Sequence, residues 1–409
     1  MTTFDGVRVL FETGTAADGW ADDWSRSEAH RPNGCETAPD EAFFGELAAR
    51  INIGPEARQA CARASVMLRD NPVLWRLFRH CHWCLFGRDG YPHDVMAHWP
   101  PVPAAVHPAA PLFYALVLLA GIPAVLERNR VLSIPDAITL ETLGDLDRWL
   151  IEYRKVHGCW GYSNLYWLWN HFQGRIFSLG RLQFCFDPYE FDYRAFRHRD
   201  NTGIRLMAPA GIKVRTDGQY DGVSGVRDPA AFITGGWETP GRIQAHPVSP
   251  DGRIQPVAET LDKREWGEVL SPRDTGISVH IPAGTPLDPA LCAASFRQAE
   301  GFFRRHFPDY TVRAYFTVTW LFDNTLAQVL PPDSNVIRFQ RMFHLFPFPQ
   351  ANDRQMWERV FDSPGGRPAN PPCRTSLQRA ILAHIDRGGH FHIGGGLILP
   401  PVVAATPTA

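Results

Sequence analysis

The stretch from Thr275 to Phe348 most constrains the fold, because strand and helix signals alternate along it without interruption. Asp288 followed by Pro289 is typical of a helix start, since an N-cap carboxylate precedes a proline in the first turn. Side-chain periodicity then predicts, in order, a strand, a loop, a helix, a strand, two helices and a strand over residues 275–281, 282–288, 290–306, 310–320, 323–330, 334–343 and 344–348. This order predicts a mixed α+β domain.

The part before this domain has helical signals only. Apolar periodicity predicts helices over residues 41–50, 54–69, 71–86, 112–128 and 140–156. Gly, Pro, Asp and Thr crowd residues 217–252, which predicts long surface loops of the kind that often carry function. We therefore divide the chain into a flexible N-terminal segment, an all-helical domain, a mixed-sheet domain flanked by helices and a flexible tail, over residues 1–40, 41–157, 158–399 and 400–409.

Composition narrows the class of partner. The 409 residues include 41 basic and 43 acidic ones, a formal charge of -2, which argues against binding to nucleic acid or to an anionic membrane. A small molecule is the expected partner. The first 24 residues lack a cationic segment followed by an apolar one, so we expect a cytoplasmic protein. Residues 111–126 are the most apolar, but they include Pro123 and fall short of the roughly 20 residues of a spanning helix. A buried helix is expected there.

Metal binding is not expected. The eight cysteines are interpreted as free thiols, and Cys81 and Cys84 have no second cysteine pair with which to complete a zinc site. Both fall on the apolar stripe of the helix predicted over 71–86. His390 and His392 would point the same way on a strand, but two ligands do not make a site.

A resemblance to a known family rests on four stretches of the sequence. In order, they are VHIPAGTPLDP, AEGFFRRHFPDY, TWLFDNTLAQVLPPDSNVIRFQRMF and TSLQRAILAHIDRGGHF. They resemble a bacterial family in which a helical N-acyltransferase N-terminal domain precedes a GNAT-like C-terminal domain, over about residues 174–392. The resemblance implies transfer of an acyl group from a thioester donor, acyl-coenzyme A or an acyl carrier protein, to an amine of a small molecule. The alternatives are a non-catalytic GNAT-fold binding protein and, ranked last, a Ser or Cys hydrolase, for which no Gly-x-Ser-x-Gly elbow exists.

The same resemblance places the donor between two splayed strands, residues 276–281 and 312–320, with its pyrophosphate at the following helix start. The donor-binding residues that it implies are Ile281, Ala283, Gly284, Thr285 and Asn335. The loop departs from a typical GNAT loop in having one glycine, two prolines and Asp288, whose carboxylate caps the amides that a phosphate needs. An acyl carrier protein as donor, or coenzyme A held differently, is therefore an open alternative.

Four residues are expected to serve catalysis or to border the acyl acceptor. His280 is the preferred general base, against the alternative that it only hydrogen-bonds a neighbouring element. Ser334 is the candidate acid for the leaving thiolate, although capping of the next helix is its default explanation. Trp320 and Asp323 are expected to border the acyl acceptor. Arg181 is expected to project into solvent.

Overall fold

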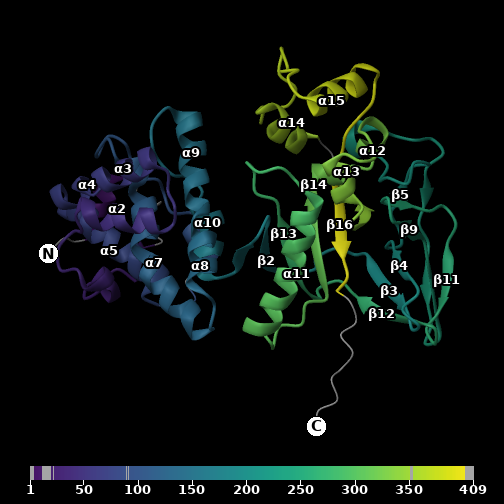
Figure 1. The fold of residues 1–409 in the computed structure, drawn as a ribbon, viewed down its shortest axis with the longest axis horizontal. Helices are drawn as coiled ribbons and strands as arrows, with labels where there is room; N and C mark the ends of the chain where they lie inside the picture. Colours follow the sequence, from purple (N-terminus) through teal and green to yellow (C-terminus); the bar gives the residue numbers. More distant parts are fainter. Residues whose placement is uncertain are drawn as a thin grey trace, which may run out of the picture. The chain divides into compact units, whose positions relative to one another are not determined.

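The computed structural model describes residues 4–11, 20–21, 23–88, 90, 92–350 and 353–400. The chain divides into two units, Met1–Ser178 and Leu179–Ala409, which are described separately (Figure 1). The first unit is helical apart from residues 176–178, which begin the first strand, and the second unit contains the rest of the sheets. This confirms the predicted architecture, a helical N-terminal part followed by a mixed-sheet domain flanked by helices.

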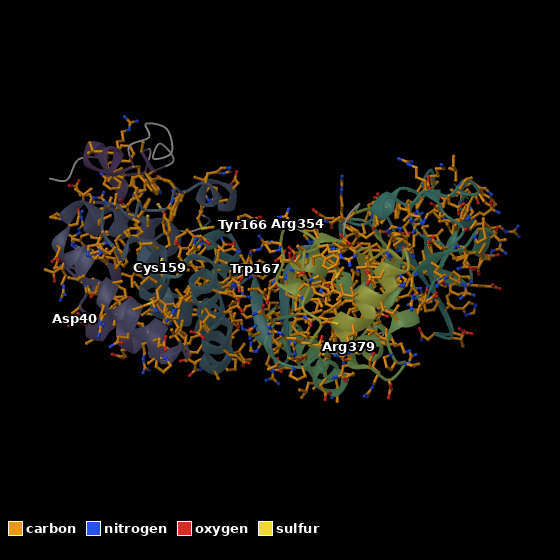
Figure 2. The ribbon with its side chains drawn as sticks, turned by 90° about the horizontal axis from the view of Figure 1, so that it is seen from above. Asp40, Cys159, Tyr166, Trp167, Arg354 and Arg379 are labelled. Carbon is orange, nitrogen blue, oxygen red and sulfur yellow. The ribbon has the colours of Figure 1, made fainter. Side chains whose placement is uncertain are left out.

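Helices make up the regular structure described in the first unit. They are α1 (Phe4–Leu10), α2 (Glu41–Arg50), α3 (Pro55–Ala64), α4 (Val66–Asp70), α5 (Pro72–Phe86), α6 (His93–Ala97), α7 (Phe113–Val131), α8 (Asp136–Leu143), α9 (Asp145–His157) and α10 (Leu165–Gln173). Asp40 accepts a hydrogen bond from the Phe43 amide and so begins α2 (Figure 2). Two predicted helices are each divided, one at Ser65 and the other at Gly144.

The core of this unit forms around α7. Among the described residues, Ala110–Val131 is the one helical stretch long and apolar enough to span a membrane by composition, yet 78% of its apolar window is buried. Cys81 and Cys84 are fully buried in the same core, as their helical stripe predicts. The stretch therefore packs as a core helix, in agreement with the buried helix expected there.

Two boundaries differ from the sequence prediction. The first unit extends to Ser178 and not to residue 157, because the aromatic run after Gly158 forms α10, which packs on the helical core. The segment predicted to be flexible, residues 1–40, contains α1 and the fully buried Val7 and Trp20 in its described part. Residues 401–409, most of the predicted tail, lie outside the described residues.

The second unit is organised by two sheets. The larger has the strand order β1-β2-β13-β14-β16-β15, and the next β10-β9-β4-β3-β12. Strands of the larger sheet are β1 (Ile176–Leu179), β2 (Leu182–Pro188), β13 (Thr275–His280), β14 (Ala314–Thr319), β15 (His344–Pro347) and β16 (Gly394–Ile398). Those of the next sheet are β3 (Arg194–His198), β4 (Ile204–Met207), β9 (Pro247–Ser249), β10 (Arg253–Ile254) and β12 (Trp266–Leu270).

Smaller elements complete the unit. Two short sheets are made of β5 (Lys213–Val214), β6 (Phe232–Ile233), β7 (Trp237–Glu238), β8 (Arg242–Ala245) and β11 (Glu259–Asp262). The helices are α11 (Pro289–His306), α12 (Leu326–Val329), α13 (Asn335–Gln340), α14 (Arg354–Phe361) and α15 (Ser376–Asp386). The predicted order of strands and helices over 275–348 is therefore confirmed, with α12, α13 and β14 shorter than predicted.

The two faces of the larger sheet have different neighbours. Phe184 and Tyr315 pack their rings against Phe296 of α11, which lies along β13 and β14 in Figure 1. Phe316, the next residue of β14, belongs instead to the core shared with Val248 of the second sheet. Because side chains alternate along a strand, the even positions of β14 and the positions level with them in β13 and β2 face the second sheet.

Glycines in β16 allow close approach of the segment after β14. A Cβ added to Gly394 would lie 2.2 Å from the backbone oxygen of Phe322, whereas one added to Gly301 on α11 would meet nothing within 4 Å. We expect Gly394→Ala to lower the free energy of unfolding by roughly 1–3 kcal/mol. Gly301→Ala should instead raise it by up to roughly 1 kcal/mol, since alanine favours a helix. Urea unfolding of both variants checks this, and equal effects would contradict it.

Candidate active site

The central parallel pair of strands separates after three residue pairs. Gly276, Ile277 and Ser278 of β13 are level with Ala314, Tyr315 and Phe316 of β14, and the pairing stops there. Beyond that point each strand remains paired on its other side, β13 with β2 as far as His280 and β14 with β16 as far as Thr319. The sheet thus parts between β13 and β14 at their C-terminal ends, as the resemblance implies for a splayed strand pair.

His280 ends a column of polar side chains next to this opening. The Ser278 hydroxyl donates to a carboxylate oxygen of Asp187 and lies 3.1 Å from His280 Nε2. Because Ser278 has a single hydroxyl hydrogen and gives it to Asp187, the second bond is donated by His280 Nε2–H. This leaves Nδ1 as the basic atom of the neutral ring. The column faces the second sheet, since Ser278 and Phe316 are level in the ladder.

The same column contains the one group of three possible metal ligands among the described residues. Cys185 is level with Ser278 across the β2–β13 pair, and its sulfur lies within 4.8 Å of the ligand atoms of Asp187 and His280. Sequence spacing does not indicate this group, because Asp187 and His280 come from strands far apart in the chain. Thiolate, carboxylate and imidazole are a donor set that suits zinc.

Asp288, the N-cap residue of α11, binds the backbone amides at the start of that helix. The Asp288 carboxylate accepts from the amides of Ala290 at 2.7 Å and Leu291 at 3.3 Å, while the Cys292 amide donates to the Asp288 carbonyl. Pro289 has no amide hydrogen. The cap that the sequence predicts is confirmed, and it uses the first-turn amides of α11.

Arg181 contradicts the expectation that it projects into solvent. Its guanidinium donates to the carbonyls of Thr285 at 2.8 Å and Pro286 at 3.0 Å, and its backbone amide donates to Ser295 of α11. The turn between β1 and β2 therefore holds the loop before α11 in place. Sequence reasoning missed this because the contact joins segments about a hundred residues apart.

The residues expected to bind the donor lie in two places. Ala283, Gly284 and Thr285 are exposed in the loop between β13 and α11, after the half-buried Ile281 and Pro282. Gly284 has φ 103°, a conformation that favours glycine. Asn335 is exposed in the first turn of α13.

Ser334 is the N-cap of α13. Its hydroxyl oxygen accepts from the Ile337 amide at 3.4 Å, so the capping explanation is confirmed. This bond uses an oxygen lone pair and leaves the hydroxyl hydrogen available for donation. Its role as an acid stays a prediction.

Trp320 and Asp323 follow β14 but are not open to solvent. The Trp320 side chain is buried, and its backbone amide donates to Gln355 at 2.7 Å. Asp323 is fully buried and its carboxylate accepts from the backbone amides of Thr325 and His392, each at 2.7 Å. The Asp323 carboxylate is therefore used within the fold, and its contact with an acyl acceptor stays a prediction.

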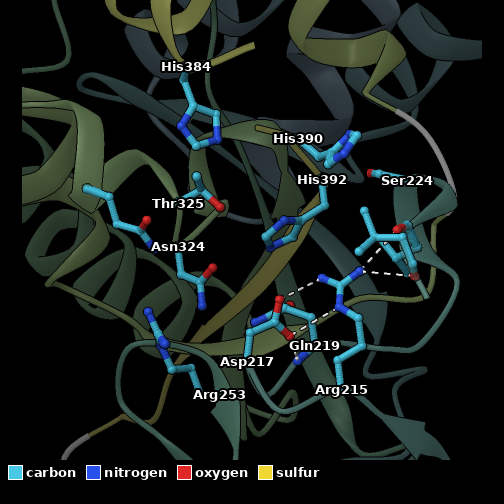
Figure 3. Close-up of a pocket in the computed structure, with 13 residues that line it drawn as sticks. Arg215, Asp217, Gln219, Ser224, Arg253, Asn324, Thr325, His384, His390 and His392 are labelled. Carbon is cyan, nitrogen blue, oxygen red and sulfur yellow. Dashed lines mark hydrogen bonds and ion pairs between the residues drawn. The ribbon is translucent and has the colours of Figure 1, made fainter. Parts of the chain in front are cut away.

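A cavity of about 210 Å³ lies beside Asp323 (Figure 3). Its walls come from α12, from the irregular segment before β16, from α15, from β10 and from the loop after β5. The lining side chains are Arg215, Asp217, Gln219, Val223, Ser224, Val226, Arg253, Asn324, Thr325, Gln328, His384, His390 and His392. Sequence reasoning indicated the loops after residue 217 and the pair His390 and His392, but not that the fold brings them together.

The fold and the opened strand pair define a GNAT-like acyltransferase. Residues 176–398, more than half of the chain, match the model of the GNAT-like C-terminal domain, and residues 42–174 match that of the N-acyltransferase N-terminal domain. The chain belongs to this family of acyltransferases, as the sequence resemblance indicated. The match assigns it to enzymes and gives no support to the alternative of a non-catalytic binding protein. No curated protein matches the chain.

Solved structures show the same fold over nearly the whole chain. An acyltransferase in complex with decanoyl-CoA and teicoplanin is 23% identical, with a TM-score of 0.66 over 98% of this chain and 100% of that chain. An acyltransferase mutant in complex with octanoyl-CoA is 22% identical, with a TM-score of 0.64 over 97% and 99%. At this identity the likeness establishes the fold.

Proposed function

We propose that this acyltransferase moves the acyl group of an acyl-coenzyme A to an amine of a small molecule. The observation that carries the proposal is the opening between β13 and β14 next to the column of Asp187, Ser278 and His280. The amide groups of a pantetheine arm can hydrogen-bond to the strand edges there, as an added strand does. Acyltransferases of the same fold hold decanoyl-CoA or octanoyl-CoA, and one also holds teicoplanin, which supports the choice of both substrate classes.

The proposed chemistry needs a base on the acceptor side. His280 takes a proton from the ammonium group, and the free amine attacks the thioester carbonyl. The carbon–sulfur bond breaks as the amide bond forms, and the second proton of the attacking nitrogen passes to the leaving thiolate through the Ser334 hydroxyl or a water, which is thereby restored. Asp187 and Ser278 hold the His280 ring so that Nδ1 is its proton acceptor.

Product analysis tests the proposal. The purified protein is incubated with acetyl-, octanoyl- or decanoyl-coenzyme A and with teicoplanin or simple primary amines, and products are identified by mass spectrometry. The proposal expects an acylated amine and one equivalent of free coenzyme A. If acyl-coenzyme A gives no product and the same acyl group on a carrier protein does, the donor is the carrier protein. Absence of product from every donor would overturn the proposal. The cytoplasmic location and bacterial source stay predictions.

The capped start of α11 gives a second test, of how the donor phosphates are held. Asp288→Asn keeps an oxygen that can cap Ala290 and Leu291 but removes the negative charge. If the pyrophosphate lies near this helix start, we expect the variant to bind coenzyme A roughly 2-fold to 30-fold more tightly. The carboxylate that repels the phosphates is then removed, and the positive end of the helix dipole attracts them. Calorimetric titration measures the dissociation constant.

Pantetheine is the control ligand, since it has the same arm without the phosphates. Its affinity should be equal for the wild-type protein and Asp288→Asn. An equal gain for both ligands, or no gain for coenzyme A, would place the phosphates away from α11.

A further inference from the structure

Three possible metal ligands lie on one face of the β2–β13 strand pair. The two strands are paired along the whole of β13, and Cys185 is level with Ser278 in that ladder. Because side chains alternate along a strand, Cys185 and Asp187 of β2 share a face with Ser278 and His280 of β13. A continuous ladder therefore holds the backbone from which the three possible ligands, Cys185, Asp187 and His280, project.

The distances among the three ligands suit a single ion. Their ligand atoms, the Cys185 sulfur, an Asp187 carboxylate oxygen and a His280 ring nitrogen, all lie within 4.8 Å of one another. Around a tetrahedral zinc ion two such atoms are about 3.3–3.6 Å apart, given zinc–ligand bonds of roughly 2.0–2.3 Å. The farthest pair therefore has to approach by at most about 1.5 Å. Rotation of the side chains provides this without any movement of the paired strands.

The charge and softness of the ligands indicate zinc. A thiolate and a carboxylate each carry one negative charge and a neutral imidazole none, so together they balance the two positive charges of the ion. This balance matters because Cys185 is only 3% exposed, and an uncompensated charge is costly at a buried position. Thiolate and imidazole favour zinc over magnesium and calcium, which take oxygen ligands.

Solvent has access to the site, and the ligand set is an open one. Asp187 and His280 are half-buried, and the separation of β13 from β14 begins directly after Ser278. An ion from solvent can therefore reach two of the three ligands. Three protein ligands leave the fourth position of a tetrahedral zinc ion to water or another small ligand. Reversible binding is expected, in contrast to a closed structural site with four protein ligands.

We propose that Cys185, Asp187 and His280 bind one zinc ion and that the bound ion inhibits the enzyme. A neutral imidazole has one nitrogen lone pair in its plane, which binds either a proton or a metal ion. Zinc bound to His280 therefore removes the base, whichever ring nitrogen it uses. The Cys185 thiol releases its proton on binding, and zinc replaces the Ser278 hydroxyl at Asp187. Inhibition rests on the proposed function, whereas binding of the ion does not.

Cobalt(II) absorption tests the binding without turnover. Cobalt(II) replaces zinc in sites of this kind, and a thiolate ligand gives it a sulfur-to-metal charge-transfer band. Chelator-treated protein titrated with cobalt chloride should show this band, saturating at one equivalent, and added zinc should abolish it. Cys185→Ser should lack the band, whereas Cys373→Ser, which removes an exposed thiol, should retain it. No band in the wild-type protein, or equal bands in the two variants, would overturn the proposal.

Activity measurements test the inhibition. Chelator-treated enzyme should be fully active, lose most of its initial rate when zinc is added, and recover it with EDTA. Initial rates are required because coenzyme A released later also binds zinc. Cys185→Ser retains Asp187 and His280, so its rate without zinc should equal that of the wild-type protein. Its zinc concentration for half-inhibition should rise by at least about 10-fold to 100-fold, the loss expected even for a residue that only supports a ligand.

Three outcomes of these rate measurements would overturn the inhibitory site. They are loss of activity on treatment with the chelator, activation by zinc, and equal inhibition of the wild-type protein and Cys185→Ser. Cys373→Ser is the matched control and should be inhibited like the wild-type protein.

Thermal unfolding guards against a variant that fails to fold. Zinc should raise the melting temperature of the wild-type protein by mass action and leave that of Cys185→Ser unchanged. If the serine variant does not fold, Asp187→Asn takes its place, since it removes one ligand charge and should reduce the zinc-dependent rise. No rise in the wild-type protein, or an equal rise in a folded variant, would contradict the site.

The failure of this site and the failure of the proposed function give different results. If the wild-type protein acylates an amine but shows no cobalt–thiolate band, the metal site is wrong and the acyltransferase function stands. If the band depends on Cys185 but no donor yields an acylated amine, the metal site stands and the proposed function is wrong.

Discussion

Replacing His280 by alanine is expected to lower kcat by roughly 10²-fold to 10⁴-fold, the usual contribution of a positioned general base. The melting temperature should change little, because His280 is half-buried at the last position of β13 and is not part of the apolar core. Single-turnover acylation with saturating donor and acceptor measures the chemical step. Differential scanning calorimetry of the same sample measures stability.

Added imidazole provides the control for this variant. If the lost group is a base, imidazole in the buffer should restore part of the rate of His280→Ala and should not affect the wild-type protein. The restored rate should rise with pH as imidazole loses its proton. A variant with full activity, or a large fall in melting temperature that accounts for the loss, would contradict the assignment.

The helical unit should lose stability steeply in mild acid. Burial and then the Arg76 charge lower the pKa of His80 to about 3, and burial and then the neighbouring His30 lower the pKa of His82 to about 3. Ser27 and the Ala120 carbonyl hydrogen-bond these neutral rings. Above the unfolded-state pKa of 6.5 neither state gains a proton, so this stability is fully present. As pH falls from 6.5 toward 3, the unfolded chain binds protons that the native chain does not, and stability is lost.

The expected slope is roughly 1.4 kcal/mol per pH unit for each of the two histidines. Urea unfolding followed by tryptophan fluorescence at several pH values between 7 and 5, all below about 0.2 M salt to preserve charge effects, gives the slope. His82→Phe should reduce it by roughly 1.4 kcal/mol per pH unit. The exchange of exposed His98 for phenylalanine shows whether removal of any histidine has that effect. Equal slopes in the wild-type protein and His82→Phe would contradict the prediction.

Local signals were sufficient for much of the fold. The sequence predicts β13, α11 and β14 correctly because their signals are local. Apolar alternation marks the strands, and Asp288 and Pro289 mark the start of the helix within a few residues. Predictions failed where packing decides. Ser65 divides a helix that periodicity alone would continue, and the aromatic run of α10 is a helix of the first unit because it packs on that core.

The candidate site was harder to predict from the sequence, because its residues come together only through the pairing of strands that are far apart in the chain. The resemblance indicated His280, but Asp187, which accepts a hydrogen bond from the neighbouring Ser278, comes close only when β2 pairs with β13. The cavity likewise needs the loops near Arg215 to meet the segment before β16. Asp323 was expected to border the acceptor, and in the structure its carboxylate accepts a hydrogen bond from the backbone amide of His392.

Because the pairing between β13 and β14 ends early, main-chain groups of both strands are open to a ligand, and this affects how the sequences of such enzymes diverge. A donor arm held by main-chain amides and carbonyls requires no particular side chain, so the strands that recognise it can exchange residues freely and still bind it. Recognition of this kind leaves little trace in the amino-acid sequence. Relatives that have diverged beyond sequence detection are then better found by backbone shape than by any motif. The shape to look for is a parallel strand pair that separates after a few residue pairs.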